Sequence, residues 1–338
     1  MLELVICVVA LVIAGWAIAK NYDAKVVLFA TGLILLAIAV MLGHPAVSAK
    51  ATSGLNWVDP FKAVKDLFIS QYSNAGLIIL TLFGFAAYMS HIGANDMVIR
   101  VLSKPLERVH SPYILVPLVY WVGTLLSIII PSASSLAVIL MATLYPVLRA
   151  ARMSVLTAAG VIATTATIVP TPLGGDNVVA ARVLGFDHVV DYVFYHHAPI
   201  TVPALIIIGV VHYFWQRYMD KRQEGKVTAE IDESKLKNRD LTGVPVYYAL
   251  FPVLPLILVI FFWACFRHAK VGLVEITIFC FALAFICELI RKGNVKQGMK
   301  DANLFFKGMG EGFSQVVVLI VAASTMVAGL RAMGMIDM

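Results

Sequence analysis

The chain has 338 residues, of which 60% are apolar and 14% are charged, and its mean hydropathy is +0.88. A soluble domain is about half apolar, so this composition excludes an ordinary soluble protein and indicates one embedded in a lipid bilayer. The formal net charge of +6 does not indicate nucleic-acid binding, because Lys and Arg collect in the cytoplasmic loops of membrane proteins whatever their function.

Apolar segments recur along the chain, and a segment that crosses the lipid core is expected to be helical, because lipid offers the backbone no hydrogen-bond partners. The segments fall at about 1–19, 25–43, 74–91, 112–130, 135–148, 154–169, 196–216, 246–266, 271–290 and 312–331. The segments 135–148 and 154–169 are too short to cross alone. The sequence therefore predicts an all-α polytopic membrane protein.

The distribution of basic residues predicts the orientation of the segments, because Lys and Arg resist translocation. With the N-terminus outside and 112–148 entering and returning as a re-entrant hairpin, 19 of the 26 Lys and Arg residues lie in cytoplasmic loops. This bias favours that topology.

An internal repeat is indicated when the chain is compared with itself at an offset of 241 residues, which aligns Ile79 with Ile320 and Gly93 with Gly334. The two aligned spans run in opposite directions in the predicted topology, as in the inverted repeats of secondary transporters. The counterpart of the hairpin would begin beyond Met338, so we expect an incomplete second repeat. The expected parts are a first repeat at 1–216, a cytoplasmic linker at 217–243 and the truncated start of a second repeat at 244–338.

Pro131 begins a polar interruption between the two halves of the predicted hairpin. Its serines are expected to cap a helix that restarts at Leu136. Broken backbone at membrane depth is tolerated only where protein or a water-filled cavity satisfies it, and the positive end of the restarting helix suits a carboxylate. The alternative is a kinked helix whose serines bond only to backbone. The candidate substrate-binding residues are Ser132, Ala133, Ser134 and Ser135.

A second interruption at Pro170-Thr171-Pro172-Leu173-Gly174-Gly175-Asp176-Asn177 predicts a broken helix near 154–184. Asp176 or Asn177 is expected to cap a second half-helix over Val178–Val183. Two interrupted segments close together are a pointer to a transporter binding site. The candidate substrate-binding residues here are Thr171, Gly174, Gly175 and Asn177.

Asp176 is an ionisable group at membrane depth, which is a functional hypothesis by default. Its carboxylate would repel a dicarboxylate, so a role in coupling, with a proton or a sodium ion, is favoured over direct substrate contact. The alternative is that Asp176 is simply a helix N-cap. By contrast, Glu275 and Glu288 lie near the ends of one segment and are expected to reach the headgroups.

Signatures of enzymes, metal sites and cofactor sites do not occur in the sequence: it has no HExxH, GxSxG or Walker motif and no Cys/His cluster at zinc-ligand spacing. We therefore expect neither an enzyme nor an ATP-driven pump. Coupling to an ion gradient, or exchange, remains.

Four stretches resemble the DcuC-type anaerobic C4-dicarboxylate carriers: Gly84–Met97, Ser103–Leu106, Ser111–Tyr113 and Phe214–Lys221. The resemblance implies transport of succinate, fumarate and malate across a bacterial inner membrane by proton coupling, exchange or efflux during anaerobic growth. Ser132-Ala133-Ser134 resembles the family's hairpin motif and Gly175-Asp176 its break.

The chain departs from the family at Ser135, where the family commonly has glycine, and members of the family continue beyond position 338. The sequence leaves three alternatives open. The chain could be a truncated, non-transporting membrane remnant, it could act as a homodimer, or it could be an ion antiporter of similar architecture. Sodium dependence would favour the antiporter, and competition by succinate would count against it.

Overall fold

The computed structural model describes residues 2–109, 111–130, 133–223, 241–269 and 271–336. Within these ranges every regular element is a helix and no strand occurs. Six of these helices are long and apolar enough to cross a membrane. The predicted class, an all-α polytopic membrane protein, is confirmed.

The chain forms two compact units, and each is described by itself. The first unit comprises Met1–Leu80 and Gly310–Met338, and the second comprises Thr81–Met309. The first unit thus combines the two ends of the chain. The predicted division into two repeats joined by the linker 217–243 stays a prediction.

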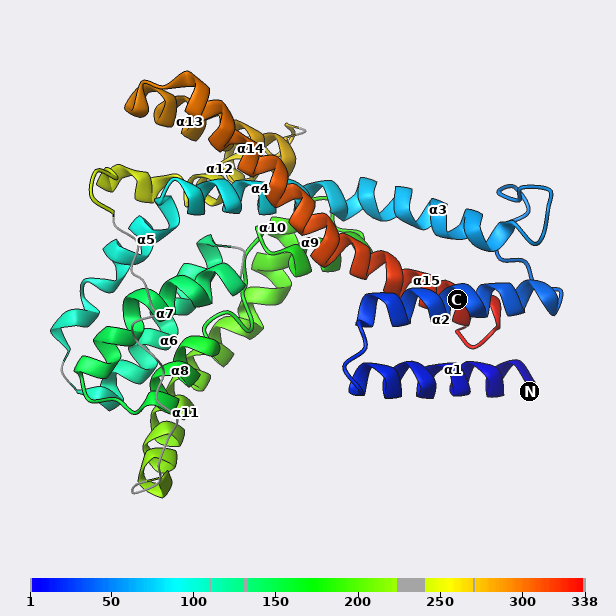
Figure 1. Cartoon of the computed structure of the whole chain (residues 1–338), viewed down its shortest axis with the longest axis horizontal. Helices are drawn as coiled ribbons and strands as arrows, with labels where there is room; N and C mark the ends of the chain where they lie inside the picture. Colours follow the sequence, from blue (N-terminus) through cyan, green and yellow to red (C-terminus); the bar gives the residue numbers. More distant parts are fainter. Residues whose placement is uncertain (1, 110, 131–132, 224–240, 270, 337–338) are drawn as a thin grey trace. The chain divides into compact units, whose positions relative to one another are not determined.

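Three helices form the core of the first unit: α1 (Leu2–Ala19), α2 (Ala24–Met41) and α15 (Val318–Ala332). The helices α2 and α15 pack side by side (Figure 1). Cys7, Leu35 and Met326 are buried where the three helices meet. The unit also contains α3 (Asp59–Gln71) and two π-helical turns, η1 (Tyr72–Gly76) and η6 (Phe313–Val317).

The second unit holds the remaining elements. They are α4 (Leu77–His91, which begins in the first unit), α5 (Ala94–Ser103), η2 (Leu106–Arg108), α6 (Pro112–Ile129), α7 (Ala133–Ala150), α8 (Val155–Ala163), α9 (Gly175–Val183), α10 (Val189–Tyr192), η3 (Val193–His197), α11 (Ala198–Gln223), η5 (Val246–Leu250), α12 (Leu254–Cys265), α13 (Leu273–Lys292) and α14 (Val295–Gly312, which ends in the first unit). An apolar core joins α5, α6, α7 and α8 to Leu205 of α11.

The predicted hairpin corresponds to α6 and α7, which pack against each other. The helix α7 begins at Ala133, three residues before the predicted restart at Leu136, so that expectation was wrong. Ser134 and Ser135 therefore lie in the first turn of α7. A helix that starts earlier brings its first N–H groups closer to the interruption.

The predicted broken helix corresponds to α8 and α9. The helix α8 ends at Ala163 with Thr164 as its C-cap, and α9 begins at Gly175 with Gly174 as its N-cap. The expectation that Asp176 or Asn177 caps the second half-helix was wrong, because both lie inside its first turn. The two prolines and the glycines of this stretch account for the eleven-residue interruption at 164–174.

Helix boundaries recur at the offset of 241 residues found in the sequence. The π-helical turn at Tyr72–Gly76 corresponds to that at Phe313–Val317, and the following helices α4 and α15 correspond end to end. Each helix is followed by a glycine with positive φ, Gly93 at 81° and Gly334 at 73°. The spacing of these breaks thus matches the spacing of the sequence repeat.

Candidate functional site

The two interruptions meet at one pocket in the second unit, with a volume of about 180 Å³. Pockets that hold drug-sized ligands are about 300–1,000 Å³, so this cavity suits a smaller solute. Its lining comes from the end of α6, the start of α7 and the stretch between α8 and α9. The lining residues are Ser127, Ile130, Ala133, Ala166, Thr167, Val169, Thr171, Gly174, Gly175 and Asp176.

Buried side chains of the interruption hold its irregular backbone in place. The Asn177 amide donates from Nδ2 to the carbonyl oxygens of Val169 (2.8 Å) and Thr171 (2.9 Å). The Thr171 hydroxyl donates to the Ile128 carbonyl at the end of α6 (2.8 Å). Thr171 and Asn177 are 1% and 2% exposed. They satisfy carbonyl groups that a broken helix leaves free, and they tie the break to the hairpin.

Two helix N-termini face the same pocket, because Ala133 is the first residue of α7 and Gly175 is the first residue of α9. The first N–H groups of a helix have no partner within it, and the aligned peptide dipoles give this end a partial positive charge. Gly174, the N-cap of α9, contributes no side-chain hydrogen bond that would occupy these groups. The arrangement can therefore accept anionic oxygens.

Asp176 supplies the only charge among the described lining residues. Its side chain is exposed, and no hydrogen bond or ion pair of its carboxylate occurs within the described part of the chain. The carboxylate folds over Gly174: a Cβ atom there would lie 2.6 Å from Oδ1 of Asp176. Glycine at position 174 thus leaves the space in which this carboxylate lies.

The structure brings together Ala133, Thr171, Gly174, Gly175 and Asp176, five of the residues predicted from the sequence. Asn177 lies beside them, but its amide faces backbone carbonyls. Ser132 lies outside the described residues, as do the side chains of Ser134 and Ser135.

Sequence reasoning missed Ser127 and Thr167, which also line the pocket. Ser127 lies inside the apolar segment of α6 with no interruption around it, and its hydroxyl donates to the Thr124 carbonyl (2.6 Å). No local signal distinguishes it from a serine that only bonds to its own helix. Thr167 stands in a run of small and polar residues near the end of the predicted apolar segment 154–169.

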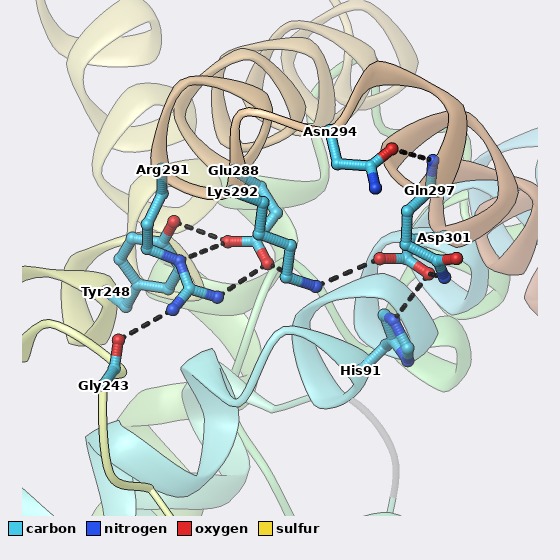
Figure 2. A network of polar contacts seen from close by, with 9 residues as sticks. All are labelled: His91, Gly243, Tyr248, Glu288, Arg291, Lys292, Asn294, Gln297 and Asp301. Atoms are coloured by element: carbon cyan, nitrogen blue, oxygen red, sulfur yellow. Dashed lines mark hydrogen bonds and ion pairs between the residues drawn. The ribbon is translucent and has the colours of Figure 1, made fainter.

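A second polar cluster, shown in Figure 2, is formed by residues none of which lines the pocket. Glu288 of α13 is 1% exposed and pairs with Arg291 (2.7 Å) and Lys292 (2.9 Å). The Tyr248 hydroxyl donates to Glu288 (2.6 Å). The expectation that Glu288 reaches the headgroups was therefore wrong, because these partners hold it in the interior.

The same cluster continues to α14 through Lys292, which pairs with Asp301 (3.1 Å), and Asp301 pairs in turn with His91 at the end of α4 (3.3 Å) (Figure 2). These contacts connect α13, α14 and the end of α4. Among the described residues, no group of three His, Cys, Asp or Glu side chains is arranged to hold a metal ion.

The chain matches one protein family along almost its whole length. The profile of the C4-dicarboxylate anaerobic carrier family, DcuC, matches residues 2–338. The anaerobic C4-dicarboxylate transporter DcuC of Escherichia coli K12 is 38% identical over 341 residues, which cover 99% of this chain and 72% of that protein. The probable anaerobic C4-dicarboxylate transporter DcuC of Vibrio cholerae is 35% identical over 343 residues, covering 100% and 73%. Solved structures provide no match.

These similarities agree with the architecture. The family is one of transporters, not enzymes, and the apolar helices make the chain a multi-pass inner-membrane protein. From the extent of the match and the level of identity, the chain belongs to the C4-dicarboxylate anaerobic carrier family.

Proposed function

We propose that the chain carries succinate, fumarate and malate across the bacterial inner membrane, and that they bind in the pocket between the hairpin and the broken helix. The observation that carries the proposal is the convergence of both helix interruptions on this one pocket. Interrupted helices that meet in a cavity form the binding sites of many secondary transporters.

The two helix N-termini account for recognition of two carboxylates. One carboxylate would accept hydrogen bonds from the N–H groups at the start of α7, near Ala133, and the other from those at the start of α9, near Gly175. The hydroxyl groups of Ser127 and Thr167 also line the pocket, but each already donates to a backbone carbonyl, so the helix N–H groups would be the main donors to a bound carboxylate. A molecule with a single carboxylate would use only one of the two ends and bind more weakly.

Asp176 has a different role in this proposal, because its negative charge would repel the substrate. A coupling cation, a proton or a sodium ion, would neutralise the carboxylate before a dicarboxylate enters the pocket. Transport would then require both the cation and the substrate in the same cavity, which couples their movements.

The test is uptake of labelled succinate by cells that lack other dicarboxylate carriers and express this chain. We expect uptake above the empty vector, competition by unlabelled fumarate and malate, and no competition by a monocarboxylate of the same length. Asp176→Asn should reduce uptake at least tenfold, because the neutral amide cannot bind the coupling cation.

Asp187→Asn is the matched control, because Asp187 is an exposed aspartate that does not line the pocket. Cells that express Asp187→Asn should take up as much succinate as cells that express the unaltered chain. Absence of uptake despite verified membrane insertion would contradict the proposal. Sodium movement across the membrane that added succinate does not change would favour an ion antiporter. Chemical cross-linking in the same membranes tests for a homodimer.

A further inference from the structure

A line of polar side chains runs between α8 and α11 in the second unit. His212, Gln216 and Asp220 follow one another at four-residue spacing, so they share one face of α11. They face Ser154 at the start of α8, Thr157 in its first turn and Thr164 at its end. The outer face of the same part of α11 is apolar and exposed, as at Phe214 and Trp215. This polar line accounts for a histidine inside an apolar helix.

Short polar contacts follow the line from Asp220 to His212. Asp220 Oδ1 accepts from the hydroxyl groups of Ser154 (2.6 Å) and Thr157 (2.7 Å). The Thr157 hydroxyl also lies 3.1 Å from Oε1 of Gln216, and Nε2 of Gln216 lies 3.5 Å from Nδ1 of His212. At the other end, Nε2 of His212 lies 3.1 Å from the Thr164 hydroxyl.

The tautomer of neutral His212 follows from these partners. The Thr164 hydroxyl donates to the Val161 carbonyl (2.9 Å), so it accepts from His212, and Nε2 carries the proton. Nδ1 then carries no proton and accepts from Nε2 of Gln216. It is therefore the atom at which His212 takes up a second proton, after which the amide can turn its oxygen toward the new N–H.

His212 lies at the C-terminal end of α8. Thr164 is the C-cap of α8, where unpaired carbonyl groups and the peptide dipoles create a partial negative charge. In transporters with interrupted helices, such C-terminal ends coordinate the coupling cation or proton. The side chain of His212 is half-buried, so a proton can reach it.

The polar line is connected to the pocket through the interruption between α8 and α9. The Thr167 hydroxyl donates to the Thr164 carbonyl (3.0 Å), and Ala166 and Thr167 line the pocket. The described lining carries one negative charge, at Asp176, and no positive charge. A dicarboxylate brings two more negative charges, so a cation close to the lining would favour its binding.

We infer that His212 is a proton-binding group of the carrier, and that its protonation favours binding of the dicarboxylate. This inference rests on the proposed function. A proton from water adds to Nδ1 of the neutral imidazole, giving an imidazolium ion, and it returns to water when the substrate leaves. His212 acts through Thr164 and through its charge without touching the substrate. By thermodynamic linkage, His212 must in turn bind its proton more tightly when the substrate is bound.

Few other groups face His212. The ring of Tyr120 on α6 lies alongside it, with centroids 5.3 Å apart. On α8 its neighbour is the uncharged Thr164, and on α11 it contacts Gln216, beyond which lies Asp220. Asp220, two turns away on α11, accepts hydrogen bonds from Ser154 and Thr157.

The experiment is isothermal titration calorimetry of fumarate binding to the purified chain in detergent, between about pH 6 and about pH 8.5, the range in which histidine titrates. Fumarate remains a dianion throughout. We expect the affinity to fall with rising pH by up to tenfold per pH unit, the limit set by linkage to one proton. Titrations in two buffers of different ionisation enthalpy should show uptake of up to one proton per bound fumarate.

His212→Gln should take up fewer protons per bound fumarate than the unaltered chain, so its affinity should fall less steeply with pH. The matched control is His196→Gln, which changes an exposed histidine just before α11 and should keep the full pH dependence. A pH dependence and a proton uptake in His212→Gln equal to those of the unaltered chain would overturn the inference.

Thr164→Val gives a second route if His212→Gln does not fold. Removing the hydroxyl that accepts from Nε2 weakens a hydrogen bond that is stronger in the charged imidazolium, so the midpoint should move about one pH unit lower. An unchanged midpoint would count against His212. The number of protons taken up on binding is measured on the unaltered chain and needs no variant. Fumarate binding without proton uptake would refute the inference and leave the proposed function intact. Failure to bind fumarate at any pH would refute the proposed function.

Discussion

Two acidic side chains of this protein, Asp176 and Glu288, show how the surroundings of a carboxylate decide its role. Glu288 accepts from Tyr248 and is paired with two cations, so its charge is fully compensated inside the protein. Burial and the neighbouring Glu288 carboxylate raise the pKa of Tyr248, which keeps its hydroxyl protonated and able to donate. Asp176 has no such partners among the described residues and faces a pocket. We therefore assign a structural role to Glu288, and the proposed role of Asp176 in coupling agrees with its place at the pocket.

Replacing Glu288 should test the structural role. Glu288→Gln removes the negative charge between Arg291 and Lys292 and should lower the free energy of unfolding by about 1–3 kcal/mol, less than for a fully buried pair because both cations are partly exposed. Thermal unfolding in detergent measures the change. The matched control is Glu275→Gln on the same helix, where the exposed Glu275 accepts only from the Gly272 N–H (3.0 Å). Equal losses in both variants would refute this role.

At the scale of helices, close contact between elements depends on small residues, because helices in lipid are held together by packing and not by exclusion of water. The helices α4 and α14 cross where Gly84 and Gly308 approach each other. A Cβ atom at Gly308 would lie 2.6 Å from Cβ of Ala87 and 2.8 Å from the Phe83 carbonyl oxygen. These contacts involve backbone, which cannot yield as the end of a flexible side chain can.

Gly308→Ala should therefore destabilise the protein by about 1–3 kcal/mol by forcing α4 and α14 apart. Gly310→Ala is the matched control two residues further along the same helix, where an added Cβ atom meets no atom within 4 Å. Alanine there should be neutral or slightly stabilising, since it favours the helix over glycine. Thermal unfolding of both variants measures this difference in stability. Similar melting temperatures would contradict the close contact between α4 and α14 at Gly308.

At the scale of the whole molecule, the bias of basic residues predicts which ends of the helices face the cytoplasm. The helix α13 is a simple case, because its 20 residues are long and apolar enough to cross once. The predicted topology places the loop before it outside, and it places the end of α13 and the start of α14, which hold Lys292, Lys296 and Lys300, inside. The positive-inside rule thus predicts opposite exposure of two sites less than thirty residues apart.

Single cysteines at His268 and Lys296, both exposed positions flanking α13, test this topology in a chain whose four native cysteines, Cys7, Cys265, Cys280 and Cys287, are replaced by serine. A membrane-impermeant maleimide should label His268→Cys in intact cells and Lys296→Cys only after the membrane is permeabilised. Each variant is the control for the other. Labelling of both from the same side would show that α13 does not cross.

The sequence by itself determined the helical membrane class and the places where the helices break. Lipid leaves a crossing segment no alternative to the helix, and the disruptive effect of Pro170, Pro172, Gly174 and Gly175 on a helix is local, so both features can be recognised without knowing any distant contact. The same local signals located five of the residues that line the pocket.

Only the tertiary structure decided which side chains meet. Helices apolar on every side give no periodic signal of the face that packs inward, so the place of Ser127 in the pocket and the burial of Glu288 could not be predicted. His212 meets Thr164 across 48 residues of sequence, and Tyr248 meets Glu288 across 40. The exact starts of α7 and α9 also depend on such contacts, because buried partners such as Asn177 and Thr171 hold the broken backbone where a local cap was expected.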